Sequence, residues 1–251
     1  MIKAIFFDID GTLIPHGQTT MPESTVLALQ KLREKGIKLF IATGRPPNSI
    51  DHVRKLFDFD GYLTANGQYC FNDKELIFEK YIPNESIKVL LPYLDESHAP
   101  VLFAMLDKSY RNRYNTSQFD SVWPIADLNM LENEKIIQIM AHIQPEDDEE
   151  FLAHLPHCKS SRWTDEFADI IPEDGGKEKG INKMIEYYGI SLDEVMAFGD
   201  GGNDISMLKY VPYGVAMGNA GEQVKNSASY VTSDVDKDGI YEACKHFKMI
   251  D

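Results

Sequence analysis

The sequence predicts an α/β protein whose parallel sheet is interrupted by a smaller α+β segment. Two observations point to this class: strand-like apolar runs alternate with helical patterns at both ends of the chain, whereas the middle combines a hairpin with short strands and helices. With 251 residues, the chain is long enough for two domains that each bury a core. We therefore expect a core built from the two ends and an inserted domain between them.

The N-terminal part contains a strand, a helix and a second strand in succession. The expected elements are a strand at 5–7, a helix at 23–35 and a strand at 37–42. Pro22 is suited to begin the helix and Gly36 to end it, because proline fits the first helical turn and glycine fits the C-terminal cap. Such a βαβ unit requires a parallel sheet with a right-handed crossover.

The same alternation returns in the C-terminal part. Its expected elements are a helix at 181–188 that ends at Gly189, a strand at 195–198, a helix at 205–209 and strands at 214–217 and 229–232. The α/β pattern therefore occupies both ends of the chain.

The middle of the chain follows a different pattern. It contains a hairpin at 68–78, a helix at 85–96, strands at 100–106 and 136–143, an acidic helix at 145–155 and a strand-rich end. We expect residues 82–171 to form an inserted α+β domain, and residues 1–81 with 172–251 to form the core.

Composition excludes several classes of protein. A formal net charge of -15 argues against general nucleic-acid binding, which rewards clustered Lys and Arg. No apolar run approaches the roughly 20 residues of a membrane helix. The three cysteines, Cys70, Cys158 and Cys244, are far apart and odd in number, which fits a reducing cytoplasm. We expect a soluble cytoplasmic protein; its oligomeric state is left open, and a monomer fits the weak apolar periodicity of the middle segment.

Polar clusters follow three of the expected parallel strands. They are DIDGT at 8–12, TGR at 43–45 and GDGGND at 199–204. In open parallel sheets, ligands bind outside the carboxyl ends of the strands. If the three strands are neighbours, the clusters meet in one crevice.

This crevice would hold Asp8, Asp10, Asp200 and Asp204. So many carboxylates cannot stay ionised together without a counter-charge, and oxygen ligands suit a hard divalent cation such as Mg²⁺. The neighbouring glycines let backbone N–H groups hold an anion such as phosphate. Two simpler alternatives stay open: Asp10-Gly11 as a plain turn, and Asp204 as the cap of the next helix.

Together with a Lys-Gly pair at 179–180, these clusters resemble the four motifs of the haloacid dehalogenase (HAD) superfamily. Their order and spacing are similar to the Cof-type branch, in which a large α/β cap is inserted between the second and third motifs. The stretch at 214–232 and Asp238-Gly239-Ile240 also resemble that branch. The resemblance implies a Rossmann-like core with an inserted cap.

The resemblance also implies catalytic roles. Asp8 matches the nucleophile that forms an aspartyl-phosphate, and Asp10 matches the general acid/base. Alternation along a strand would bring the two side chains out on the same side. Mg²⁺ would be held by Asp8, the backbone carbonyl of Asp10 and Asp200.

Further residues match the phosphate-binding positions of the family. Thr43, Gly44 and Lys179 would bind the phosphoryl group, and Asn203 would contact either the phosphate or the metal shell. The Lys-Gly register favours Lys179 over Lys177, which is interpreted as a solvated loop charge.

Substrate specificity is expected in the insert. The side chains there that are best suited to grip a polar or planar molecule are Arg111, Arg113, Trp123, His142, Arg162 and Trp163, although each is also compatible with a structural role. Arg45 is left open between contact with phosphate and contact with the cap, and Asn219 between a loop residue of the branch and a turn former.

The leading hypothesis is a Mg²⁺-dependent phosphatase of small phosphomonoesters, sugar phosphates or related metabolites. The alternatives are a phosphomutase of the phosphomannomutase type and a non-catalytic regulator that binds sugar phosphates. Product analysis separates them, because only a phosphatase releases inorganic phosphate.

Overall fold

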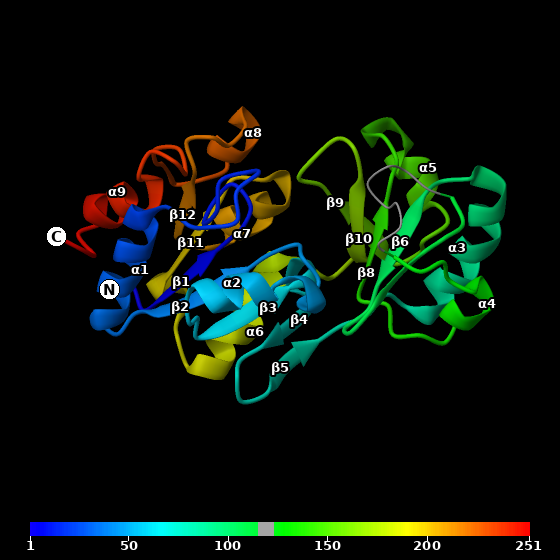
Figure 1. Cartoon of the computed structure of the whole chain (residues 1–251), viewed down its shortest axis with the longest axis horizontal. Coiled ribbons are helices and arrows are strands. Elements are labelled where there is room, and N and C mark those ends of the chain that lie inside the picture. Colours follow the sequence, from blue (N-terminus) through cyan, green and yellow to red (C-terminus); the bar gives the residue numbers. More distant parts are fainter. Residues whose placement is uncertain (115–122) are drawn as a thin grey trace.

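The computed structural model describes residues 1–114 and 123–251, which form two β-sheets flanked by helices (Figure 1). Within these ranges the larger sheet has eight strands in the order β13-β12-β11-β1-β2-β3-β4-β5. They are β1 (Ala4–Phe7), β2 (Lys38–Ala42), β3 (Gly61–Thr64), β4 (Tyr69–Phe71), β5 (Leu76–Glu79), β11 (Val195–Gly199), β12 (Tyr213–Ala216) and β13 (Tyr230–Val231). Pairing is parallel from β13 to β3 and antiparallel in the β3-β4-β5 edge. The expected α/β class is confirmed.

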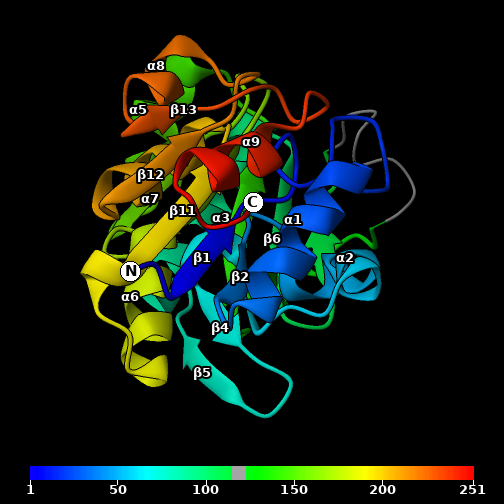
Figure 2. The same ribbon diagram turned by 90° about the vertical axis from the view of Figure 1, so that its left-hand side faces the viewer.

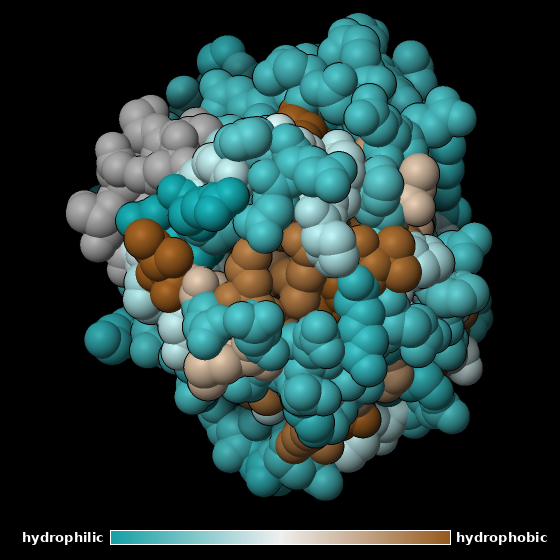
Figure 3. Space-filling model, turned by 90° about the vertical axis from the view of Figure 1, so that its right-hand side faces the viewer, coloured by the Kyte–Doolittle hydropathy of each residue, from teal (hydrophilic) through white to brown (hydrophobic). Residues whose placement is uncertain are grey.

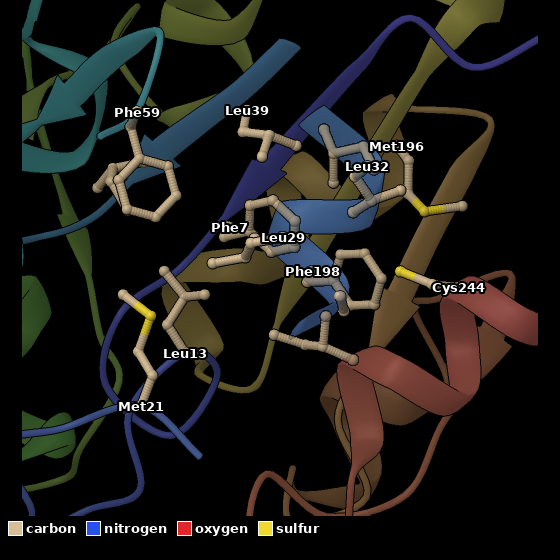
Figure 4. Close-up of a cluster of buried hydrophobic side chains, with 14 of the residues drawn as sticks. Phe7, Leu13, Met21, Leu29, Leu32, Leu39, Phe59, Met196, Phe198 and Cys244 are labelled. Atoms are coloured by element: carbon tan, nitrogen blue, oxygen red, sulfur yellow. The ribbon is translucent and has the colours of Figure 1, made fainter. Parts of the chain in front are cut away.

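Helices cover both faces of this sheet (Figure 2). One face carries α1 (Glu23–Glu34), α2 (Asp51–Leu56) and α9 (Gly239–His246), and the other carries α6 (Lys177–Tyr188), α7 (Ile205–Tyr210) and α8 (Glu222–Lys225). Because side chains alternate along β1, Ile5 and Phe7 pack in the first core and Phe6 in the second. Figure 4 shows the first core, in which the stacked rings of Phe7 and Phe198 lie 5.2 Å apart.

Two glycines end helices where the sequence predicts. Gly36 follows α1 with φ of +76°, and Gly189 follows α6 with φ of +64°, a region that favours glycine. Beyond Gly36, the amide of Ile37 donates to the carbonyl of Leu32 at 3.2 Å, which closes the end of α1. None of the helices in the described ranges is long and apolar enough to cross a membrane.

The second sheet is formed by the chain between β5 and α6. Its described part has five antiparallel strands in the order β7-β6-β8-β10-β9. They are β6 (Val101–Ala104), β7 (Ser109–Arg111), β8 (Gln138–Ala141), β9 (Cys158–Ser161) and β10 (Ala168–Pro172), and the helices of this part are α3 (Asn84–Ser97), α4 (Leu128–Leu131) and α5 (Asp148–Leu152). Figure 3 shows the side of the molecule that carries α3 and α4. Most of this surface is hydrophilic, and it surrounds a smaller apolar area.

Alternation divides the second sheet into two faces. Phe103, Ile139 and Ile170 point to one face and pack with residues of α3 and α5 in an apolar core. Residues at the intervening positions, among them Gln138 and Asp169, line the space toward the larger sheet. We propose that the two sheets mark two domains with the boundaries expected from the sequence, although β10 continues one residue beyond the boundary at 171.

Several elements differ from the expectation. The acidic helix expected at 145–155 is a 3-10 turn, η3 (Pro145–Asp147), followed by the short α5. Sequence periodicity did not predict β3, β7, α2 or α9, because such short elements depend on tertiary packing more than on propensity. The remaining 3-10 helices are η1 (Pro47–Ser49), η2 (Ala65–Gly67), η4 (Leu192–Glu194) and η5 (Gly202–Asp204).

Buried polar groups connect the two sheets at η2. The side-chain amide of Asn66 donates to Asp169 Oδ2 at 2.9 Å and to Gln138 Oε1 at 3.1 Å. Gln138 Nε2 in turn donates to the carbonyl of Gly44 at 3.3 Å. Asn66 adopts a left-handed conformation with φ of +53°, which tertiary contacts hold in place. This network fixes the inserted domain against the loop after β2.

Burial of the Asp169 carboxylate in this network costs free energy. It is 2% exposed, and its Oδ1 has no hydrogen-bond partner among the described residues. Burial raises the pKa of Asp169 to about 7, although Asn66 and the charge of Lys177 favour the carboxylate. Ionised Asp169 therefore destabilises the fold.

The Asp169→Asn substitution should change how stability depends on pH. Since the folded-state pKa lies above the unfolded value, wild-type stability should fall as pH rises from about 4 to about 7, and the substitution should remove that slope. In urea unfolding we expect the advantage of Asp169→Asn over wild type to grow from about pH 4 and to level off above about pH 7 at a few kcal/mol. Asp165→Asn, at an exposed position, should show the wild-type pH dependence. Parallel profiles for wild type and Asp169→Asn would contradict this account.

Candidate functional site

The three polar clusters meet at one edge of the larger sheet. They follow β1, β2 and β11, which are neighbours in the order β11-β1-β2, as expected. Asp8, Thr43 and Asp200 line a cleft of about 630 Å³ between this edge and the inserted domain. The carboxyl ends of the central strands therefore form the floor of the cleft, as the Rossmann-like topology requires.

Asp8 comes directly after β1 and is paired with a buried lysine. Lys177, the first residue of α6, is 1% exposed and donates from Nζ to Asp8 Oδ1 at 2.7 Å and to Asp204 Oδ1 at 2.5 Å. Although burial disfavours the ammonium, the carboxylates of Asp204 and Asp8 raise the pKa of Lys177, so it stays charged. The lysine thus holds two carboxylates beside each other.

The structure corrects the expected lysine. Lys179 is exposed, whereas Lys177 reaches Asp8. Residues two positions apart in a helix point to nearly opposite sides, so α6 cannot direct both side chains into the cleft. The Lys-Gly register that favoured Lys179 contained no information about which side of the helix would be buried.

Asp8, Asp200 and Asp204 form an acidic cluster whose ligand oxygens lie within 4.8 Å of one another. Burial, together with repulsion from Asp204, raises the pKa of Asp200 to about 6. Burial also raises the pKa of Asp8 well above its usual value, against the effect of Lys177. Three carboxylates thus share one ammonium, and an all-oxygen donor set with excess negative charge fits a hard divalent cation.

This cluster differs from the expected metal ligands Asp8, Asp10 and Asp200 in one member. Asp204 contributes its carboxylate to the cluster, whereas the Asp10 side chain does not. The expectation for Asp10 concerned its backbone carbonyl and stays a prediction.

Asp204 does not cap the following helix. Its Oδ2 accepts the amides of Asp200 and Gly201, each at 2.9 Å, and no side-chain cap bond to α7 is present in this described segment. Its Oδ1 faces Lys177. The fully buried carboxylate therefore fixes the loop that presents Asp200, which the helix-cap alternative did not anticipate.

Asp200 is held by side chains from two other loops. Thr12 Oγ1 donates to Asp200 Oδ1 at 2.7 Å, and Asn219 Nδ2 lies 3.3 Å from Asp200 Oδ2. His16 Nε2 lies 3.4 Å from the same Oδ2. Asn219, which the sequence left open as a turn former, therefore supports the acidic cluster.

Asp10 is paired with Arg45 in the lining of the cleft. Arg45 Nε donates to Asp10 Oδ2 at 2.8 Å, and Nη2 donates to Oδ1 at 2.6 Å. The hydrogen bond to Asp10 raises the pKa of Arg45, so the pair is a fixed bidentate contact. Because β1 ends at Phe7, the loop that follows it, and not alternation along a strand, brings Asp8 and Asp10 to the same cleft.

The loop after β2 and the loop after β11 complete the floor. Thr43 is buried, and its Oγ1 accepts the amide of Arg45 at 3.2 Å. A Cβ at Gly44 would lie 3.2 Å from Asp169 Oδ2 and 3.3 Å from Asn203 Nδ2, so the close approach of these groups depends on glycine. Asn203 itself donates to Asn66 Oδ1 at 3.1 Å.

Sequence analysis missed the contributions of Asn66, Gln138 and Asp169. Asn66-Gly67 has the pattern of an ordinary turn, and Gln138 and Asp169 are single polar residues within apolar strands. Polar residues at intervening positions of a strand normally indicate a solvent face. Here the opposite sheet covers that face.

Of the six candidate residues of the insert, two line the cleft and four do not. Trp123 and Trp163 line the cleft, and Trp163 packs against Phe167 with ring centroids 5.3 Å apart. The other four lie elsewhere: Arg111 donates to the carbonyl of Trp123, Arg113 contacts Tyr114, Arg162 pairs with Asp148, and the His142 ring packs against Phe167. Among the described residues that line the cleft, the inserted domain contributes no basic side chain.

Comparison with known proteins places this site in a family. The model of the haloacid dehalogenase-like hydrolases matches residues 5–244. YkrA of Bacillus subtilis (strain 168), a protein named as a phosphatase by inference, is 33% identical to this chain over 99% of this chain and 98% of its own length. The pyridoxal phosphate phosphatase YbhA of Escherichia coli (strain K12) is 30% identical over 95% of this chain and 96% of its own length.

Solved structures agree with this assignment. The HAD subclass IIB sugar phosphatase BT4131 superimposes with a TM-score of 0.93 at 41% identity, covering 99% of this chain and all of that one. BT1666 from Bacteroides thetaiotaomicron, described as a phosphatase of the same superfamily, gives a TM-score of 0.92 at 33% identity over 100% of this chain and 96% of that one. The chain therefore belongs to the haloacid dehalogenase-like hydrolases and is a phosphatase of that family.

Proposed function

We propose that this phosphatase hydrolyses small phosphomonoesters, sugar phosphates or related metabolites, through an aspartyl-phosphate on Asp8 and with Mg²⁺. The observation that supports this most directly is that Asp8, which is paired with the buried Lys177, lines the same cleft as the Asp10–Arg45 pair. The names of two relatives refer to small phosphorylated molecules, since BT4131 is called a sugar phosphatase and YbhA a pyridoxal phosphate phosphatase.

In the first step, a carboxylate oxygen of Asp8 attacks the phosphorus. An O–P bond forms, and the bond to the leaving oxygen breaks with its electron pair. Protonated Asp10 donates a proton to that oxygen, and the alcohol departs. In the second step a water attacks the aspartyl-phosphate, Asp10 takes the proton of this water, and inorganic phosphate leaves Asp8.

Arg45 is a positioning residue in this scheme. Its bidentate contact fixes the direction of the Asp10 carboxylate while leaving the side chain of Asp10 39% exposed to the cleft. An acid/base group must be oriented toward the leaving oxygen to transfer a proton efficiently. The contact therefore orients Asp10 as the base of the second step, and one of its two hydrogen bonds must open when Asp10 carries the proton of the first step.

Mg²⁺ would be held by Asp8, Asp200 and the backbone carbonyl of Asp10, and Asp204 fixes the loop of Asp200. When bound, the ion neutralises repulsion between the carboxylates and the incoming phosphate and acts as a Lewis acid on phosphoryl oxygens. The all-carboxylate donor set and the raised pKa values of Asp8 and Asp200 support this assignment.

Lys177, Thr43, Gly44 and Asn203 are proposed to bind the phosphoryl group. Lys177 supplies positive charge beside the nucleophile and opposes protonation of Asp8. Thr43, Gly44 and Asn203 line the cleft around this point. This proposed set differs from the one expected from the sequence only in that Lys177 takes the place of Lys179.

A phosphomutase fits this cleft less well. A mutase must also bind a second phosphate of a bisphosphate, and such an anion needs cationic partners. In the part of the cleft that the structure describes, the inserted domain contributes the acidic Asp169 and no basic side chain. A non-catalytic regulator would need neither nucleophile nor acid/base, yet both Asp8 and Asp10 line the cleft.

The remaining expectations about the cellular context stay predictions. We propose a small phosphorylated metabolite as the partner, not a nucleic acid, given the formal net charge of -15. A cytoplasmic location and a monomeric state are part of the same proposal.

A phosphate-release screen tests the proposed activity. Purified protein with Mg²⁺ should release phosphate from at least one sugar phosphate, nucleotide, pyridoxal phosphate or flavin mononucleotide, and EDTA should abolish the release. Asp8→Asn should lower kcat by about 10³-fold or more, because it removes the nucleophile. Release that persists in Asp8→Asn, or no release from any of these esters, would refute the proposal.

Asp10→Ala should separate a catalytic role from a structural one. We expect kcat to fall by roughly 10²-fold or more, as for the loss of general acid/base help, while the melting temperature stays near that of wild type. Steady-state kinetics and circular dichroism measure the two effects. An unfolded variant, or one with full activity, would show that Asp10 does not transfer the proton.

Lys177→Met and Lys179→Met form a matched pair on one helix. The first should lower kcat/KM by about 10²-fold, because it removes a charged group from the transferring phosphoryl. The second should stay within about twofold of wild type, since Lys179 is an exposed surface charge. Urea unfolding confirms that each variant is folded before kinetics are compared. A larger loss of kcat/KM in Lys179→Met than in Lys177→Met would show that Lys179, the lysine expected from the sequence, binds the phosphoryl group.

A further inference from the structure

The inserted domain contributes one buried carboxylate to the lining of the cleft. Asp169 of β10 lines the cleft and is 2% exposed. Its Oδ2 accepts from Asn66, and its Oδ1 has no partner in the described part of the chain. The carboxylate thus has a buried acceptor without a partner among the described residues, on the side of the cleft that the inserted domain lines.

The sheet fixes this carboxylate in place. Ala168 and Ile170, the neighbours of Asp169 in β10, are buried in the apolar core beneath the helices. Alternation therefore directs Asp169 to the opposite face, where Met140 is its partner across β8. Asp169 cannot turn away from the cleft unless β10 changes register.

The charge of Asp169 is not neutralised by an ion pair. Arg45 is engaged with Asp10, and Lys177 is shared by Asp8 and Asp204. In the described lining, the other residues of the inserted domain are neutral: Leu102, Ser109, Trp123, Gln138, Met140, Trp163 and Phe167. Ionised Asp169 therefore gives the side of the cleft that the inserted domain lines a negative potential, next to aromatic and neutral polar groups.

The binding free energy of a leaving group next to this carboxylate should depend on the charge of that group. A second anion near ionised Asp169 would be repelled more than in bulk water, because the surrounding protein lowers the local dielectric constant. A hydroxyl or an ammonium could instead donate to the unused Oδ1. The Oγ of Ser109, also buried and without a partner in the described residues, offers a further neutral contact.

We propose that Asp169 is a specificity-determining residue that excludes substrates with a second anionic group and favours monophosphates whose leaving group is neutral and hydroxylated or carries an ammonium. The proposal rests on the proposed phosphatase function of the same cleft. It narrows the substrate class by charge: bisphosphates and carboxylated phosphate esters are rejected, and sugar or amino-sugar monophosphates are accepted.

Competition measures this preference without requiring that each compound be turned over. Hydrolysis of p-nitrophenyl phosphate with Mg²⁺ is measured at about pH 8, above the pKa of Asp169, with glucose 6-phosphate, glucosamine 6-phosphate or glucose 1,6-bisphosphate as the inhibitor, and the three inhibition constants are compared. In wild type, the constant for the bisphosphate should be at least about tenfold higher than that for glucose 6-phosphate, while glucosamine 6-phosphate should bind at least as well as glucose 6-phosphate.

Asp169→Asn should bring the constants for the bisphosphate and glucose 6-phosphate within about threefold of each other, because the repelling charge is gone. Asp165→Asn removes the same charge at an exposed position outside the cleft lining and should keep the wild-type ratio. Asp169→Ser provides a second neutral variant if Asp169→Asn unfolds early.

The outcomes distinguish the two proposals. A wild-type bisphosphate constant equal to or lower than that of glucose 6-phosphate, or a ratio that is unchanged in both Asp169 variants, would overturn the role of Asp169 while leaving the phosphatase intact. No release of p-nitrophenol by the wild type, or undiminished release by Asp8→Asn, would overturn the proposed function and this inference with it.

Discussion

The sharing of one buried ammonium by buried carboxylates is the interaction on which the site depends. Lys177 contacts Asp8 and Asp204, and Asp200 lies in the same cluster. Each charge would be costly to bury alone, so the lysine, the nucleophile position and the loop after β11 are mutually dependent. The charge that stays uncompensated is what makes the site suitable for a divalent cation and for phosphate accompanied by one.

A second buried network joins the site to the inserted domain. Asn66 contacts Asn203 of the floor on one side and Gln138 and Asp169 of the inserted domain on the other. Gln138 also reaches the carbonyl of Gly44. The loops after β2 and β11 and the part of the inserted domain that lines the cleft are therefore held by the same side chains, although they belong to different sheets.

Much of the fold was predictable, because it follows from local patterns. The βαβ unit at the N-terminus, the helix ends at Gly36 and Gly189 and the hairpin near residue 72 are all present. The short elements β3 and α9 were missed, since packing rather than periodicity stabilises them. Among the site residues, Asp8, Asp10, Thr43 and Asp200 line the cleft as expected. The pairing of Arg45 with Asp10 and the role of Asp204 were not anticipated.

The sequence by itself determined the family, the α/β class and the convergence of acidic and glycine-rich loops on one sheet edge, because these are encoded in short motifs and in the order of strands. Only the tertiary structure decided which lysine contacts Asp8 and which polar residues of the insert reach the cleft. Lys177 and Asp8 are 169 positions apart, and Asn66 and Asp169 are 103 apart. Burial and partnership of such groups depend on how the sheets and helices pack, and local pattern does not contain that information.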